Sequence, residues 1–323
     1  MEGYLNLEPG DAIPSLPPLL GPGDFLRTEG PWFKDGMGRT LLLHGVNVAG
    51  SMKMPVKPDG ATWRRDPAFW EHHRNVSFVG RPFPIEVGVP TTAPNAPNAV
   101  SPACSNSHAH HPPDSQEADE HFARLRAWGL TFLRFLVTWE AVEHSGPGLY
   151  DMDYVHYVRD LVRKAGDHGI FVFIDPHQDV WSRWTGGDGA PGWSLEAVGF
   201  NLSTIEKSGV AVTHQGHGDP LPKMIWGTNN WYLGTATMFT LFFAGNRFAP
   251  ETMIEGEPVQ DYLQRHYIDA MMVVATALKV DQSPPSPFSY AFSFTRAKQW
   301  TQAHCFFTYY YPFPSFWTRV ALI

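Results

Sequence analysis

The feature that most constrains this chain is a buried apolar stretch that ends in a dense polar group. Residues 170–174 read IFVFI, and Asp175, His177, Gln178 and Asp179 follow directly. A continuous apolar run of this kind after a helix-like segment is typical of a strand buried in a parallel sheet. Polar residues at the carboxyl end of such a strand are where α/β enzymes keep their sites. We therefore expect a functional site at this strand end.

The segments before this strand alternate between helix and strand patterns. Residues 117–129, EADEHFARLRAWG, place Phe122, Leu125 and Trp128 at helical spacing and stop at a glycine, so they predict an amphipathic helix. The next residues, TFLRFLV, predict a strand that ends near Trp139 and Glu140. Helix and strand are joined without a long loop, which is typical of an α/β fold.

A second helix and an earlier strand complete this alternation. Residues 154–169 predict a helix with one buried face, closed by a terminal glycine. Its expected buried residues are Val155, Val158, Leu161 and Val162. Residues 25–40 predict a hairpin with a glycine-rich turn, and LLLHGVNV after it predicts a buried strand. The order favours right-handed βαβ units and a (β/α)8 barrel, because a doubly wound sheet would carry a phosphate-binding glycine turn after its first strand.

Charge and cysteine content exclude several classes of protein. The net charge of -8 is spread over 323 residues without a basic block, so we expect no nucleic-acid partner. The first residues lack the pattern of a signal peptide, and no apolar run approaches the roughly 20 residues of a membrane span. We expect a cytoplasmic protein. Two cysteines are too few for a disulfide framework, and the histidines at 108, 110 and 111 have no regular scaffold for a metal.

Four segments together carry a resemblance to a known family. They are LLLHGVNVAGSMKMP, GLTFLRFLVTWEAVE, FVFIDPHQDVWSRWTGGDGAPGW and TMFTLFFAGNRFAP. Together they resemble glycoside hydrolase family 5, in particular its endoglycoceramidase-related fungal branch. The resemblance implies a TIM (β/α)8 barrel and retaining hydrolysis of β-glucosidic bonds in lipid glucosides, either ergosteryl glucoside or glucosylceramide. It implies no cofactor and no metal, and it allows peripheral contact with a lipid substrate.

The resemblance also implies roles for individual residues. Arg134, on the second strand of the parallel sheet, matches the arginine that supports the catalytic carboxylates of the family. His177 and Asp179 match the residues that contact sugar hydroxyls, and Lys53 is the candidate for a lysine near the sugar. Trp226, together with a second tryptophan at 231, is the candidate for an apolar wall, since aromatic rings pack on sugars and on lipids.

Each of these roles has a structural alternative. Arg134 would pair with Glu140 at a barrel rim, and His177 and Asp179 would cap the following helix or hold a loop. The glycines at 186, 187 and 189 would then form a turn with no further role, and the tryptophans would pack in the core. The residues alone leave these alternatives open.

The catalytic pair of the family has no match in the sequence. A retaining glycosidase needs two carboxyl groups about 5–5.5 Å apart, and in the family both are glutamates, one of them in an Asn-Glu-Pro motif. That motif does not occur here, and no glutamate follows Glu257. We therefore expect only the first three to four βα units of the barrel and an inactive chain. The alternative function is a non-catalytic protein that binds a glycoside or another partner through the remaining site.

Composition divides the chain into four parts. Residues 1–24 are an N-terminal extension, and residues 25–279 form the partial barrel domain, whose last predicted helix spans 259–278. Residues 87–116 interrupt that domain with a proline- and alanine-rich segment that lacks large apolar residues, so we expect disorder or a translated retained intron. Residues 280–323 form an aromatic and proline-rich tail without glycine.

Overall fold

A computed structural model describes residues 27–35, 37–48, 50–58, 66, 68–83, 116–216 and 225–280. The predicted extension, almost all of the predicted insertion and tail, both cysteines and the three clustered histidines lie outside the described residues. The elements before the central helices are β1 Arg27–Glu29, β2 Trp32–Lys34, β3 Thr40–Leu41, β4 Gly45–Asn47 and the 3-10 helix η1 Gly50–Lys53. The central elements are α1 Gln116–Ala127, β5 Phe132–Thr138, α2 Trp139–Glu143, α3 Met152–Asp167 and β6 Phe171–His177. The remaining elements are η2 Arg183–Thr185, α4 Gly192–Ala197, η3 Leu202–Thr204, α5 Trp226–Asn229, α6 Leu233–Phe248, β7 Met253–Ile254, β8 Glu257–Pro258 and α7 Val259–Val280.

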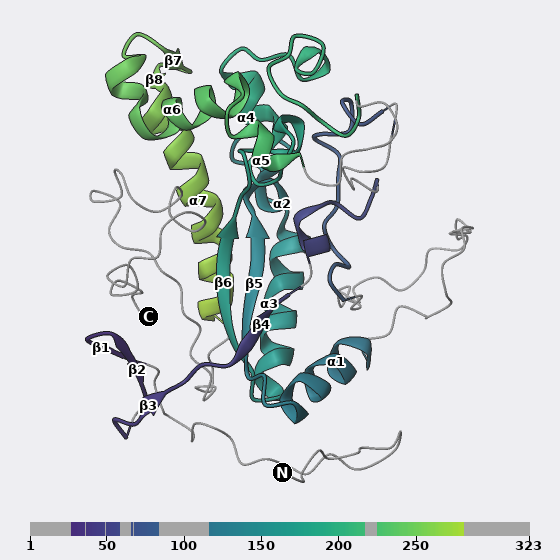
Figure 1. The fold of residues 1–323 in the computed structure, drawn as a ribbon, viewed down its shortest axis with the longest axis vertical. Coiled ribbons are helices and arrows are strands. Elements are labelled where there is room, and N and C mark those ends of the chain that lie inside the picture. The colour runs from purple at the N-terminus through teal and green to yellow at the C-terminus, as the bar shows by residue number, and fades with distance from the viewer. Residues whose placement is uncertain are drawn as a thin grey trace, which may run out of the picture.

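The centre of the fold is a parallel sheet in the order β4-β5-β6, as the alternation of strands and helices predicts. The register pairs Gly45 with Phe132 and Thr138 with His177. All three strands therefore end on the same side of the molecule, where Figure 1 shows α2, α4 and α5 above the arrowheads. This parallel sheet with its covering helices is the arrangement expected for part of the predicted (β/α)8 barrel.

Residues alternate between the two faces of this sheet, because successive side chains of a strand point in opposite directions. Leu133, Phe135 and Val137 of β5, with Val172 and Ile174 of β6, belong to the main hydrophobic core. The alternate residues of both strands face the other way, and these include Arg134 of β5 and Asp175 and His177 of β6. One face of the sheet thus builds the core, and the other carries the polar side chains.

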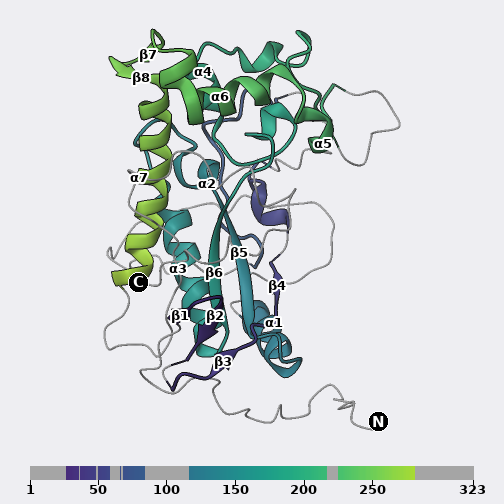
Figure 2. The same cartoon turned by 60° about the vertical axis from the view of Figure 1, so that its left-hand side comes forward.

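The core face is covered by a layer of helices in which α3 packs against both α1 and α7 (Figures 1 and 2). The side chain of Asp151 caps α3 by accepting a hydrogen bond from the backbone N–H of Tyr154 at 2.9 Å. Gly169 ends the helix with φ +70°, a conformation that favours glycine. The predicted apolar face of α3 is confirmed, since Val155, Val158, Leu161 and Val162 are all buried.

Three predictions about local structure are wrong in part. The buried strand predicted from LLLHGVNV is the short strand β4. Its Gly45 and Asn47 are exposed, because among the described residues β4 pairs only with β5. The predicted hairpin is a three-stranded antiparallel sheet, β1-β2-β3, and the glycine-rich turn joins its last two strands. Trp128 is 65% exposed, because α1 already ends at Ala127.

The last described helix, α7, confirms the prediction for residues 259–278 and extends it to Val280. Tyr262, Met271 and Val274 of this helix are buried. Within the described ranges, no helix combines the length and the apolar character that a membrane span needs.

Candidate functional site

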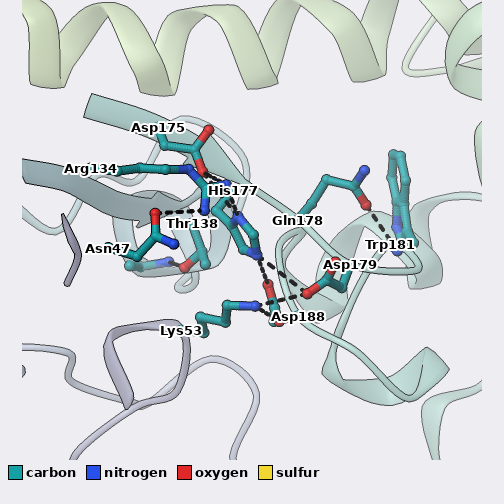
Figure 3. Close-up of polar contacts among 11 residues, drawn as sticks. Asn47, Lys53, Arg134, Thr138, Asp175, His177, Gln178, Asp179, Trp181 and Asp188 are labelled. Carbon is teal, nitrogen blue, oxygen red and sulfur yellow. Dashed lines mark hydrogen bonds and ion pairs between the residues drawn. The ribbon is translucent and has the colours of Figure 1, made fainter. Parts of the chain in front are cut away.

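A connected group of charged side chains lies at the carboxyl ends of the three parallel strands (Figure 3). Two of its members come early in the chain, from β4 and η1. The others come from β5, from β6 and from the loop after β6. We call this group the charged cluster, and it consists of Asn47, Lys53, Arg134, Asp175, His177, Asp179 and Asp188. The structure therefore brings together Arg134, His177, Asp179 and Lys53, and the tryptophans at 226 and 231 are not members of the cluster.

One half of the charged cluster is formed by side chains of β5 and β6. The guanidinium of Arg134 donates to Oδ2 of Asp175 at 2.6 Å, and Nδ1 of His177 lies 3.0 Å from the same oxygen. Asn47 contributes its side-chain oxygen, 3.4 Å from the guanidinium. The alternative in which Arg134 pairs with Glu140 is wrong, because on adjacent parallel strands Arg134 and Asp175 project from the same face.

The other half of the charged cluster surrounds an ammonium group. Lys53 Nζ lies 2.8 Å from Asp179 Oδ2 and 3.3 Å from Asp188 Oδ2. His177 joins the halves, because its Nε2 lies 3.3 Å from Asp179 Oδ2. Side-chain exposure falls from 20% for Lys53 and 14% for Asp179 to 5% for His177 and Asp188. Solvent therefore reaches the first two side chains, and the last two lie behind them.

The surroundings of these groups change their proton affinities. Burial alone would lower the pKa of His177, but hydrogen bonds to Asp175 and Asp179 raise it to about 9. Burial would raise the pKa of Asp179, yet His177 and Lys53 hold it well below its ordinary range. For Lys53, burial lowers the pKa, and the carboxylates of Asp188 and Asp179 outweigh that effect and raise it. At neutral pH the imidazole and the ammonium group are therefore charged donors, and Asp179 is a charged acceptor.

The turn after Asp179 is strained. Val180 and Trp181 adopt φ angles of +44° and +80°, which a β-branched and an aromatic residue rarely adopt. Strain of this kind persists where the surrounding structure over-determines the backbone, and it gathers at functional sites. Here the backbone of Asp179 pairs with Asp188, with both N···O distances at 3.0 Å, and the Trp181 carbonyl accepts from the backbone N–H of Ala190 at 2.6 Å. The turn thus fixes the carboxylate of Asp179 within the charged cluster.

A small apolar pocket adjoins the charged cluster and shares His177 with it. Its apolar lining comes from α2, from the loop after β6, and from α6 and α7. The aromatic lining residues are Trp139, Trp181, Phe239, Phe242, Phe243 and Tyr267. Sequence reasoning missed the role of α6 here, although TMFTLFFAGNRF supplies three of these rings.

The two tryptophans proposed as an apolar wall lie outside this pocket. Trp226 begins α5, and Trp231 follows that helix with 90% of its surface exposed. The alternative of core packing is therefore wrong for Trp231. Neither residue is among those that line the pocket, and a contact of Trp226 with the sugar stays a prediction.

Asp188 is the site residue that sequence reasoning did not single out. It stands between Gly187 and Gly189 in GGDGAP, so the available signal was an acidic residue flanked by glycines after a strand. His177, Asp179 and Asp188 place ligand atoms within 4.8 Å of one another, a spacing that suits a cation. The ammonium group of Lys53 is the cation that contacts both carboxylates. The cluster therefore offers charged donors and acceptors side by side, which suits a ligand with several hydroxyl groups.

Comparison with known proteins identifies a family and several relatives. A model of the family "Cellulase (glycosyl hydrolase family 5)" matches residues 97–201. A glucosylceramidase of Rhizopus delemar is 44% identical over 257 residues, which are 78% of this chain and 33% of that protein. An ergosteryl-beta-glucosidase of Saccharomyces cerevisiae is 34% identical over 263 residues, covering 76% of this chain and 30% of that protein.

A solved structure is similar in fold as well. Sterylglucosidase 1 of Cryptococcus neoformans aligns with a TM-score of 0.65 at 35% sequence identity, over 83% of this chain and 35% of that one. The chain spans about a third of the length of the curated relatives it matches.

Proposed function

This chain belongs to glycoside hydrolase family 5, and we propose that it supplies the glucose-binding strand ends of a retaining β-glucosidase that acts on lipid glucosides. The observation that carries the proposal is the charged cluster, in which Lys53 and Asp179 keep solvent-accessible side chains at the carboxyl ends of parallel strands. In (β/α)8 enzymes that end of the sheet holds the site.

The choice of lipid glucosides rests on the relatives. Their names join one sugar, glucose, to two different lipids, ceramide and ergosterol. A site that these relatives share is expected to recognise the glucose unit. Ammonium and imidazolium N–H groups donate to sugar hydroxyls, and the carboxylate of Asp179 accepts from them.

We further propose that this sequence by itself binds a glucoside without hydrolysing it. Retention needs a nucleophile and an acid about 5–5.5 Å apart, with the acid protonated. Within the charged cluster, Asp175 and Asp179 are each held by cationic groups, and Asp188 has only 4% of its surface exposed. The cluster is therefore suited to hold the sugar, and no pair within it has a free acid facing a free nucleophile.

Binding and turnover of simple glucosides test the proposal on the full chain. Octyl β-glucoside should bind saturably in calorimetry, octyl β-galactoside should bind more weakly, and a chromogenic β-glucoside should not be hydrolysed. Lys53→Met and Asp179→Asn should each weaken binding about tenfold, the effect of losing one charged hydrogen bond. Absence of glucoside binding would contradict the proposed function. Turnover by the unaltered chain that a folded Asp179→Asn variant lacks would show that the chain holds its own catalytic pair.

A second function, a non-catalytic glycoside-binding protein, is favoured by one observation. The charged cluster is connected by hydrogen bonds and ion pairs within the described residues alone. A chimera separates the two functions: residues of this chain replace the matching third of the Rhizopus delemar relative. Lipid glucoside hydrolysis by the chimera, lost in its Lys53→Met form, supports the enzyme lineage. A folded chimera that binds glucosides without turnover supports the second function.

A further inference from the structure

Asp188 occupies a place in the charged cluster that the backbone of its loop fixes. A side chain at Gly187 would come 1.9 Å from the carbonyl oxygen of Asp179, and one at Gly189 would come 2.3 Å from Cβ of Gln178. Only residues without a Cβ allow the loop to lie this close to the turn below it. The acid between these two glycines is therefore held against the turn by main-chain contacts on both sides.

A third main-chain contact anchors the same loop to α2. The backbone N–H of Glu140 donates to the carbonyl oxygen of Gly189 at 2.7 Å. This contact, together with the paired backbones of Asp179 and Asp188, sets the direction of the Asp188 side chain independently of its charge. Replacement of the carboxyl group by an amide should therefore leave the loop in place.

The carboxyl group of Asp188 faces the inner side of the charged cluster. Its Oδ2 lies 3.3 Å from Nζ of Lys53, and its Oδ1 lies 3.7 Å from Nε2 of His177. Oδ1 is buried and has no hydrogen-bond partner among the described residues. Solvent, and hence a sugar, reaches Lys53 and Asp179 before it reaches Asp188. Any influence of Asp188 on a ligand therefore passes through the cationic groups that it faces, and the nearer of these is the ammonium group of Lys53.

We propose that Asp188 is a positioning residue that holds the Lys53 ammonium group in the geometry for glucoside binding. This inference rests on the proposed function, because it assumes that Lys53 contacts the sugar. Two carboxylates fix the position of an ammonium group better than one, since Lys53 has a flexible four-carbon stem. Without Asp188, only Asp179 would hold the ammonium group, and that carboxylate would then have to serve both the lysine and the sugar.

The protonation of Asp188 provides a readout that a purely structural role would not give. Burial raises the pKa of this carboxyl to about 7, although Lys53 and His177 act against it. The charged groups that face it are Lys53 from η1, His177 at the end of β6 and Asp179 on the adjoining turn. Between pH 5.5 and pH 8 the imidazole of His177 stays protonated and Asp179 stays ionised, so Asp188 is the member of this group whose charge changes.

Glucoside binding by the full chain as a function of pH tests the inference. The affinity for octyl β-glucoside should rise about tenfold from pH 5.5 to pH 8 in the unaltered chain. In Asp188→Asn the affinity should be the same at both values and should equal that of the unaltered chain at pH 5.5. Asp167→Asn, an exposed change at the end of α3 and at the opposite end of the sheet, is the matched control.

Chemical labelling of Lys53 gives a second readout that does not depend on a sugar. Asp188 favours the charged ammonium group, so Asp188→Asn should increase the rate of Lys53 acylation at pH 8 severalfold, measured by mass spectrometry. In the unaltered chain the rate of Lys53 acylation should rise less steeply with pH between pH 6 and pH 8 than that of an exposed lysine. Asp188 loses its proton in this range, and its charge then favours the ammonium form.

The outcomes separate the two claims. Equal glucoside affinity and equal pH profiles in Asp188→Asn and in the unaltered chain would overturn the positioning role and leave the proposed function standing. Absence of glucoside binding in the unaltered chain would overturn the proposed function. Lys53 labelling then decides about Asp188 alone, and a labelling rate unchanged by Asp188→Asn would overturn its role. If Asp188→Asn does not fold, the pH profiles of the unaltered chain decide in its place.

Discussion

Two groups of charged residues lie close together in this fold, and they differ in how completely they are satisfied. Arg183 and Glu140 form a pair whose side chains are 3% and 0% exposed. The guanidinium of Arg183 donates to both carboxylate oxygens, at 2.5 to 3.0 Å, and stacks 4.4 Å from the ring of Trp184. In the charged cluster, by contrast, Lys53 and Asp179 remain accessible, and Oδ1 of Asp188 has no hydrogen-bond partner in the part of the chain that the structure describes.

The difference separates a structural ion pair from a binding site. A buried pair with matched donors and acceptors has no capacity left for a ligand, and its role is to hold α2 against the loop that contains η2. The charged cluster has accessible donors and acceptors, shifted pKa values and a strained turn beside it, which are features of functional sites. Both groups follow strand ends, so position at a strand end does not by itself identify the site.

The largest expected effect comes from breaking the buried pair. Glu140→Gln leaves the charge of Arg183 buried without a counter-charge, so the free energy of unfolding should fall by about 3–5 kcal/mol. Urea denaturation followed by tryptophan fluorescence measures this change. Asp179→Asn, at the partly exposed end of the charged cluster, should cost less. Equal losses for the two variants would show that the distinction between the two groups is wrong.

A smaller effect is expected from the titration of His177. Its pKa of about 9 lies above the value near 6.5 of an unfolded chain. The stability that this shift contributes is therefore fully present below about pH 6.5 and is lost as the pH rises through about 9. We expect a loss on the order of 1–3 kcal/mol between pH 6.5 and pH 9.5.

The variant His177→Gln tests this contribution, most directly above pH 8, where Asp188 has already lost its proton. His144, whose pKa is also raised because a hydrogen bond to Asp151 outweighs its burial, titrates in both proteins and cancels in the comparison. The difference in unfolding free energy between the unaltered chain and His177→Gln should shrink as the pH rises. A difference that stays constant over this range would show that His177 is not held protonated by its neighbours.

The smallest effect is expected at the exposed tryptophan. Trp231→Ala removes a side chain that is 90% exposed, so stability should change by no more than ~0.5 kcal/mol. Trp181→Ala removes a ring that lines the apolar pocket and is 4% exposed, and it should cost about 3 kcal/mol or more. Thermal unfolding of both variants checks the contrast. A marked loss of stability from Trp231→Ala would mean that a contact outside the described residues covers it.

The helices and strands of the central region were largely predictable from local patterns. The spacing of Val155, Val158, Leu161 and Val162 predicted the buried face of α3, and its terminal glycine predicted where the helix ends. Trp128 was assigned wrongly, because the same periodicity continues for one residue beyond the end of α1. The burial of β4 was overestimated, since the apolar sequence LLLHGVNV predicts a buried strand and the described residues give β4 one neighbouring strand.

The partners within the site were less predictable than its members. Arg134, His177, Asp179 and Lys53 were all proposed from the sequence, and they do lie together in the structure. The sequence did not show which carboxylate Arg134 contacts, because Glu140 and Asp175 both come near the end of an apolar stretch. The face of the sheet from which Arg134 and Asp175 project decides it. The aromatic pocket was missed for a similar reason, since its rings come from α6 and α7 as well as from α2 and the loop after β6.

The sequence by itself determined the order of the central strands and helices and the polar residues that follow each strand. Periodicity, helix caps and terminal glycines act over a few residues, so a short window contains them. The tertiary structure decided the partners of the charged residues. Arg134 pairs with Asp175, Glu140 with Arg183, and Asp188 with Lys53. These contacts join segments far apart in the chain, and they depend on strand register and on the close approach that Gly187 and Gly189 permit.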